Sequence, residues 1–228
     1  DIGETGGCPG LFQPEDYCRY YEMTVEAILR ADPHVKVGGP ALASRTHPIL
    51  PRFLDYCVNK GLRVDFVSWH IYTASPEEMA NSIRDVKTLL EQYPQIHCET
   101  ILDEWSLPEW GEIGDRANAL LKDYPTLRSA HMLAMFHVFC RYGLDRSNYY
   151  HIKEMLIVRE QFASWFSPEG LDFQERVFTS EHNWGLFDLN NRPRPHYYAY
   201  QWFQSLKGEW LVSDGGGISE DVNLFAVK

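Results

Sequence analysis

Two adjacent carboxylates and an indole, Asp103-Glu104-Trp105, end a short apolar run that begins at Ile96. The apolar residues of this run predict a buried strand, and the charges lie at its carboxyl end. Parallel α/β proteins bind ligands at that end of their strands, so acids in this position indicate a catalytic role rather than a role in solubility. Glu104 is therefore the first candidate for a catalytic carboxylate. The alternative is that the acids only cap the next loop or pair with an arginine.

Strand-like and helix-like segments alternate along the whole chain. We expect strands over 35–41, 64–72, 96–106 and 148–152, and helices over 15–31, 49–60, 75–93, 126–142 and 196–206. Ser75-Pro76 is a strong helix start, and Gly61 is a good helix end. This alternation predicts an α/β fold with a parallel sheet and helices outside it. The segment 154–179 has no clean periodicity and is not assigned.

Polar residues collect at the predicted carboxyl ends of the strands, near Glu4, Gly39, His70 and Glu104, whereas no such collection is expected at the other strand ends. Clustering at one end is expected of a (β/α) barrel, whose active site lies at the carboxyl ends of its strands. A dinucleotide-binding sheet also fits the alternation, but no G-x-G-x-x-G follows any strand. The long connection over 107–125 is a candidate lid or substrate wall.

Composition argues against several classes of partner. A net charge of −11 without a Lys/Arg cluster argues against nucleic acid, and no apolar run approaches the ~18 residues of a membrane span. Five widely spaced cysteines predict reduced thiols in a soluble protein, which slightly favours the cytoplasm, although one bridge such as Cys8–Cys18 stays open. No zinc pattern stands out among the nine histidines, and no metal or cofactor is expected.

Four motifs, in this order, resemble glycoside hydrolase family 39: Val37-Gly38-Gly39-Pro40-Ala41, Asp65-Phe66-Val67-Ser68-Trp69-His70-Ile71-Tyr72, Asp103-Glu104-Trp105-Ser106, and Trp184-Gly185-Leu186 followed by Pro195-His196-Tyr197-Tyr198-Ala199-Tyr200. The resemblance covers most of the chain, from about residue 1 to residue 206. That family contains β-xylosidases and α-L-iduronidases on a (β/α)8 barrel that retain the anomeric configuration. The resemblance therefore implies a carbohydrate substrate.

The resemblance also implies roles for individual residues. Glu104 matches the family's nucleophile at the end of the seventh strand, and Glu4 matches the acid/base at the end of the fourth. His70 and Tyr72 fall where the family places groups that contact the sugar or orient the nucleophile. Retaining hydrolysis needs an ionised carboxylate and a protonated carboxyl about 5 to 5.5 Å apart. Because Glu4 and Glu104 are 100 residues apart, only strands that bring their ends together can form this pair.

Two positions depart from the family pattern. Gly3 stands where the family usually has the Asn that holds the sugar 2-hydroxyl, and Asp103 stands where it usually has Thr. The first departure keeps open a catalytically inactive, carbohydrate-binding or structural barrel. A hydrolase that uses Asp103 in place of Glu104 is a further alternative.

Three tryptophans, Trp105, Trp110 and Trp184, are candidate sugar-binding platforms, because aromatic faces stack on the apolar faces of sugar rings. Each is equally suited to packing in the core or in a lid. His70 is likewise as suited to a hydrogen bond inside the core as to a substrate contact.

Length limits how much of a barrel the chain can hold. A complete barrel takes about 250 residues, and if Glu4 ends the fourth strand, the chain holds strands four to eight. We therefore expect a partial catalytic barrel over 1–207 and the start of a β-rich appendage over 208–228. Exposed strand edges would then favour self-association or pairing with a missing N-terminal half. The expected function is retaining hydrolysis of O-glycosides such as xylosides or uronides, by a fragment of a longer enzyme.

Overall fold

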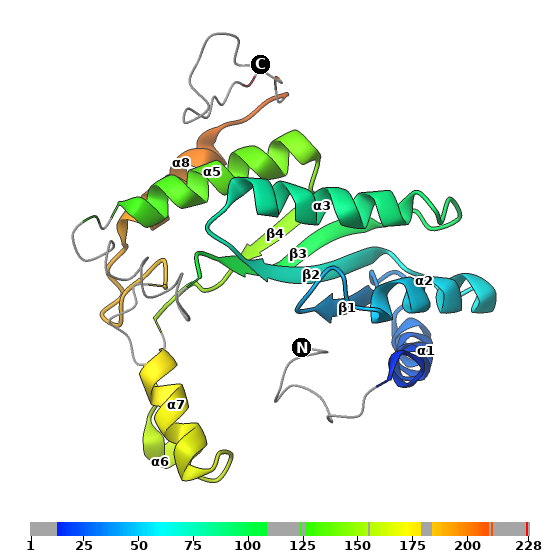
Figure 1. Ribbon diagram of the computed structural model, residues 1–228, viewed down its shortest axis with the longest axis horizontal. Helices are drawn as coiled ribbons and strands as arrows, with labels where there is room; N and C mark the ends of the chain where they lie inside the picture. The colour runs from blue at the N-terminus through cyan, green and yellow to red at the C-terminus, as the bar shows by residue number, and fades with distance from the viewer. Residues whose placement is uncertain are drawn as a thin grey trace. The chain divides into compact units, whose positions relative to one another are not determined.

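The computed structural model describes residues 13–108, 124, 126–154, 156–178, 184–209, 211 and 227. Two compact units are distinguished, the first comprising Asp1–Ile71, Glu77–Trp105 and Tyr142–Asn148, and the second comprising the remaining segments. Figure 1 traces the elements along the chain, which are α1 (Pro14–Ala31), β1 (Gly38–Leu42), α2 (Ile49–Lys60), β2 (Phe66–Tyr72), α3 (Pro76–Leu90), β3 (Glu99–Ser106), α5 (Leu127–Tyr142), β4 (Arg146–Tyr149), α6 (Arg159–Phe162), α7 (Pro168–Phe178) and α8 (Pro195–Ser205).

The strands β1 to β4 form one sheet, in which the order of the strands follows their order in the chain. β1 and β2 pair in parallel, with Gly38 opposite Phe66 and Pro40 opposite Ser68. A helix joins each strand to the next, namely α2, α3 and α5 in turn (Figure 1). Strand–helix–strand units of this kind build a (β/α) barrel. The predicted α/β fold is confirmed. As expected from Ser75-Pro76 and Gly61, α3 begins at Pro76 and α2 ends at Lys60, directly before Gly61.

Local chemistry explains the helix ends. The backbone N–H of Gln13 donates to a carboxylate oxygen of Asp16 at 3.0 Å, which satisfies a donor at the start of α1. At the carboxyl end of α2, Gly61 has a φ of 65°, a left-handed conformation that glycine adopts without the steric penalty of a side chain. Pro76 opens α3, where its missing N–H costs nothing.

The core of the first unit joins its helices to its strands through aromatic side chains. The rings of Tyr21 on α1 and Phe53 on α2 meet edge to face at 4.7 Å. Trp69 on β2 is buried and its indole N–H donates to the Ser82 hydroxyl on α3 at 2.8 Å. Because side chains alternate along a strand, this contact turns the next residue, His70, toward the opposite face of the sheet.

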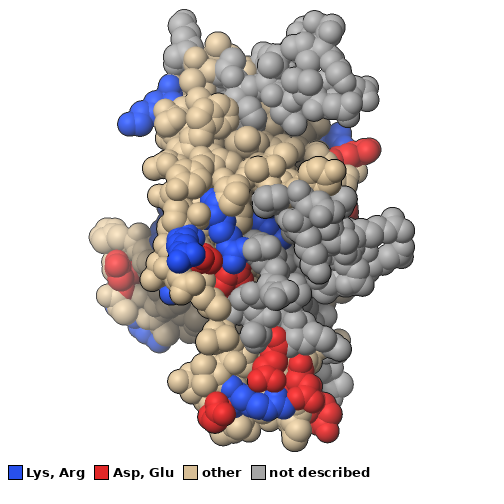
Figure 2. Space-filling model, turned by 90° about the vertical axis from the view of Figure 1, so that its left-hand side faces the viewer, with Lys and Arg blue, Asp and Glu red and all other residues tan. Residues whose placement is uncertain are grey.

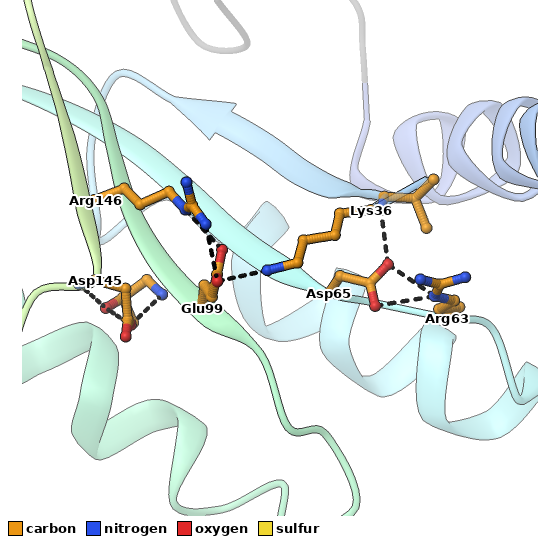
Figure 3. A network of polar contacts seen from close by, with 8 residues as sticks. Lys36, Arg63, Asp65, Glu99, Asp145 and Arg146 are labelled. Carbon is orange, nitrogen blue, oxygen red and sulfur yellow. Dashed lines mark hydrogen bonds and ion pairs between the residues drawn. The ribbon is translucent and has the colours of Figure 1, made fainter. Parts of the chain in front are cut away.

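An ion-pair network lies at the amino ends of the strands (Figure 3). Lys36, just before β1, and Arg146, at the start of β4, reach Glu99 of β3 at 2.5 and 2.9 Å. Beside them Asp65 pairs with Arg63 at 2.8 Å and accepts the backbone N–H of Val37 at the same distance. The expectation that polar residues do not collect at these strand ends is therefore wrong, because charged residues that are far apart in sequence meet there.

Some segments differ from the sequence prediction. β4 covers 146–149 rather than 148–152, and the unassigned segment contains α6 and α7. Figure 2 shows blue side chains among red ones over this helix pair, at the lower end of the view. There Arg159 pairs with Asp172 and, at 2.8 Å, with Glu175. Nearly all of the expected lid (107–125) and of the expected appendage (208–228) lies outside the described residues, so both stay predictions.

The Glu99 ion pairs predict a specific dependence of stability on pH. Hydrogen bonds from Arg146 and Lys36 lower the pKa of Glu99 from 4.5 to about 2. The stabilisation is therefore complete above pH 4.5 and is lost as the pH falls toward 2. Urea unfolding of wild type and Glu99→Gln should give curves that are furthest apart at neutral pH and converge in this acidic range. A separation that stays constant with pH would contradict the prediction.

Candidate active site

The two carboxylates singled out in the sequence lie near the carboxyl end of β3. Asp103 and Glu104 are half-buried, and Glu104 stands two residues before the strand ends at Ser106. This placement agrees with the expected side of a parallel sheet for a ligand site. Glu4 lies outside the described residues. Its position relative to Glu104 therefore stays a prediction.

His70 of β2 contacts the first of these carboxylates. Its Nδ1 atom is 3.3 Å from Oδ1 of Asp103, and the histidine is only 4% exposed. β2 and β3 are neighbours in the sheet, which is why residues 33 positions apart in sequence can meet. The structure thus places His70 beside Asp103, near the carboxyl end of β3. The roles of His70 and Glu104 toward a sugar stay predictions.

Tyr72 and Trp184, also predicted to bind substrate, belong to one aromatic cluster in the second unit. The ring of Tyr150 lies 6.3 Å from that of Tyr72 and 6.0 Å from that of Trp184. His151 adds a further ring, 5.7 Å from Trp184. These ring contacts join the last residue of β2 to segments that follow β4 in the chain.

Two of the three predicted tryptophans are buried. Trp105 is 0% exposed and Trp184 is 3% exposed, so packing accounts for most of the surface of both indoles. Trp110 lies outside the described residues. The roles of all three as sugar platforms stay predictions, and burial favours a supporting role for both Trp105 and Trp184.

Sequence reasoning missed a buried polar layer in the second unit. Arg128 is 0% exposed, and its guanidinium donates to the Ser106 hydroxyl at 3.4 Å. One turn further along α5, His131 lies 2.8 Å from the carbonyl oxygen of Thr73 through Nε2. Burial, reinforced by the positive charge of Arg128, lowers the pKa of His131 to about 4. The available signal was the helical spacing of Arg128 and His131 with the apolar residues of α5.

A second set of buried polar groups holds the turn at Trp184-Gly185. A carboxylate oxygen of Glu154 accepts the backbone N–H of Gly185 at 2.8 Å and pairs with Arg194 at 3.2 Å. His196 contacts the Gly185 carbonyl oxygen at 2.8 Å through Nε2, and burial lowers its pKa to about 3. A Cβ at position 185 would lie 2.3 Å from the backbone nitrogen of Glu154, so this close approach requires glycine.

Known proteins share the sequence pattern of this chain. The family model described as "Glycosyl hydrolases family 39" matches residues 12–228. A beta-xylosidase of Geobacillus stearothermophilus is 26% identical over 222 residues, which cover 88% of this chain and 39% of that protein. A beta-xylosidase of Caldicellulosiruptor saccharolyticus is 21% identical over 228 residues, covering 94% of this chain and 42% of the relative. The chain thus spans about two fifths of the length of the curated relatives it matches.

A solved structure shows the same fold. The crystal structure of a monomeric beta-xylosidase from Caulobacter crescentus CB15 superposes with a TM-score of 0.67 at 21% identity, and the match covers 95% of this chain and 41% of that one. At this level of identity the likeness concerns the fold alone. It confirms the predicted partial (β/α)-barrel architecture.

The buried histidine of α5 leads to a prediction about acid stability. Because the pKa of His131 is about 4 in the folded chain, against 6.5 for an ordinary histidine in water, the unfolded chain takes up a proton first. Stability should then be lost as the pH falls from 6.5 to 4, by about 3 kcal/mol for this group. His131→Gln keeps an N–H donor for Thr73 but does not titrate. Chemical unfolding should show a smaller loss for the variant over this range, and parallel curves would contradict the prediction.

Proposed function

Because the chain belongs to glycosyl hydrolases family 39, we propose that it supplies the nucleophile side of a retaining O-glycosidase active site. The observation that carries this proposal is the position of Glu104, half-buried near the carboxyl end of β3 and next in sequence to the Asp103–His70 contact. Acids at the carboxyl ends of barrel strands are where barrel enzymes carry out chemistry. The relatives described as beta-xylosidases support the same class of reaction.

The proposed reaction proceeds in two steps. The carboxylate of Glu104 forms a bond to the anomeric carbon as the bond from that carbon to the leaving oxygen breaks, and Glu4 gives its proton to this oxygen. Water then replaces Glu104 at the anomeric carbon, and Glu4 takes the proton of the water. Two inversions restore the original configuration. Neither step draws on a cofactor.

Xylosides are the substrate class we favour. The support is the name of the relatives, since each of the two curated proteins is described as a beta-xylosidase. Hydrolysis of uronides is the other substrate expectation. A catalytically inactive, carbohydrate-binding or structural barrel stays the competing function, and it rests on Gly3 at the position where the family usually has Asn.

Two finer expectations also stay proposals. One is that exposed strand edges lead to self-association or to pairing with an N-terminal half. The other is a reducing compartment such as the cytoplasm, which is supported by the free thiols of Cys18, Cys57, Cys98 and Cys140. Because Cys18 is free, the Cys8–Cys18 bridge that the sequence left open is not formed.

Within the described ranges, no helix combines the length and the apolar character that a bilayer crossing requires.

Covalent labelling tests the proposed nucleophile. We expect a 2-deoxy-2-fluoro-xyloside with an activated leaving group to attach its sugar to Glu104. The fluorine slows both formation and hydrolysis of the glycosyl-enzyme, whereas the activated leaving group speeds formation alone, so the covalent intermediate accumulates. Peptide mass spectrometry should find the added sugar on the β3 peptide. Glu104→Gln should abolish the labelling, and the matching fluoro-uronide should label the chain more slowly.

Glu99→Gln is the matched control, since Glu99 is the other glutamate of β3 and lies at the opposite end of the strand (Figure 3). This variant should label like wild type. A sugar found on Asp103 would establish the alternative nucleophile. Binding of xylosides without any label would favour the inactive, carbohydrate-binding protein.

A further inference from the structure

A turn in the second unit is held by side chains from three separate segments. The turn is Trp184-Gly185, and the backbone N–H of Gly185 donates to Oε1 of Glu154 at 2.8 Å. The hydroxyl of Tyr149 donates to the Trp184 carbonyl oxygen at 3.1 Å. Nε2 of His196 lies 2.8 Å from the Gly185 carbonyl oxygen and 3.3 Å from that of Trp184. Because carbonyl oxygens only accept, this nitrogen carries a proton and donates, so both residues of the turn are fixed through their backbone.

A buried ion pair supports the acceptor of this turn. Glu154 is 5% exposed, and Arg194 lies 3.2 Å from the same carboxylate oxygen that accepts the Gly185 N–H. Burying a carboxylate is costly unless it is paired, so Glu154 needs Arg194 as its counter-ion. The backbone N–H of Arg194 donates to the Leu186 carbonyl oxygen at 2.9 Å, and that of Glu154 donates to the Phe187 carbonyl oxygen at 3.0 Å. The ion pair therefore ties together the chain segments that meet at the turn.

The side chain that this turn places is the indole of Trp184. The indole is 3% exposed, and its ring lies 6.0 Å from that of Tyr150 and 5.7 Å from that of His151. The ring of Tyr150 in turn meets that of Tyr72 edge to face at 6.3 Å. Tyr72 and Tyr150 are half-buried, so part of each ring can be reached by a ligand. The buried indole thus supports a pair of tyrosines that are partly open.

We propose that Glu154, with Arg194 as its counter-ion, is a positioning residue that holds the Trp184 indole in place. The indole in turn supports the rings of Tyr72 and Tyr150. The link to catalysis rests on the proposed function, because the family resemblance implies that Tyr72 contacts the sugar. Rings that are already fixed lose little freedom when a xyloside stacks on them, so a fixed indole strengthens binding. Stacking of this kind is the same before and during bond cleavage, so it acts on binding and not on the rate of the chemical step.

Fluorine NMR of the complete protein labelled with 5-fluorotryptophan tests whether Glu154 positions the indole. Trp184→Phe identifies the signal of Trp184 among those of the tryptophans. In Glu154→Leu, which removes the carboxylate, we expect this signal to shift or split. The signals of Trp69 and Trp105, which are buried in the first unit and are assigned in the same way, should not move. If that variant does not fold, Glu154→Gln serves, because it removes the charge that pairs with Arg194. An unchanged Trp184 signal, or an equal change in all three signals, overturns the proposal.

Steady-state kinetics with an aryl β-xyloside tests whether this position matters to the sugar. The folded Glu154 variant should raise KM about fivefold, which is what one aromatic contact contributes, and leave kcat unchanged. Arg194→Lys keeps a cation beside Glu154 and should stay near the wild-type KM, whereas Arg194→Gln should show the increase. Glu175→Gln is the matched control, because it removes another paired glutamate of the second unit and should behave like wild type. A wild-type KM in a variant whose Trp184 signal has moved, or a fall in kcat alone, overturns the proposal.

The two proposals fail in different ways. Covalent labelling of Glu104 together with an unmoved Trp184 signal would refute the role of Glu154 and leave the glycosidase in place. Absence of both labelling and hydrolysis would refute the glycosidase. The dissociation constant of the xyloside, measured by calorimetry, then replaces KM, and it should rise by the same factor in the Glu154 variant. An unchanged dissociation constant would refute the role of Glu154 as well.

Discussion

The pairing of neighbouring strands in chain order is the constraint on which the candidate site depends. The strands also run in the same direction (Figure 1), so their carboxyl ends lie together and their amino ends lie together. Residues that are distant in sequence therefore become neighbours when they lie at the same distance from the strand ends. His70 and Asp103 meet near the carboxyl ends for this reason. Lys36, Glu99 and Arg146 meet at the amino ends for the same reason.

The two ends of the strands use charge in different ways. At the amino ends the ion pairs are partly exposed, so the pKa of Glu99 falls because its partners favour the ionised form. Exposed pairs of this kind usually contribute little to stability one by one. Near the carboxyl ends the histidine is buried and contacts a carboxylate of the neighbouring strand.

Much of the fold was predictable because it depends on local chemistry. Gly61 and Ser75-Pro76 mark helix ends by backbone rules that act within a few residues, and β3 carries a recognisable apolar run. Other features depend on contacts over long distances. In the sequence Arg128 looks like an ordinary surface arginine, and only the folded chain shows that it is fully buried. α7 was missed because its surroundings expose large apolar residues such as Trp165 and Phe173, so no clear buried stripe appears.

The central claim is that Glu104 belongs to a pair of carboxyl groups that together cleave a glycosidic bond with retention. A crystal structure of the complete protein with a sugar bound covalently measures this most directly, through the separation of the carboxyl groups of Glu4 and Glu104. The claim predicts a separation of about 5 to 5.5 Å across the anomeric carbon. Carboxyl groups that face different sides of the sheet, or that lie about 6.5 Å or more apart with a water between them, would contradict it.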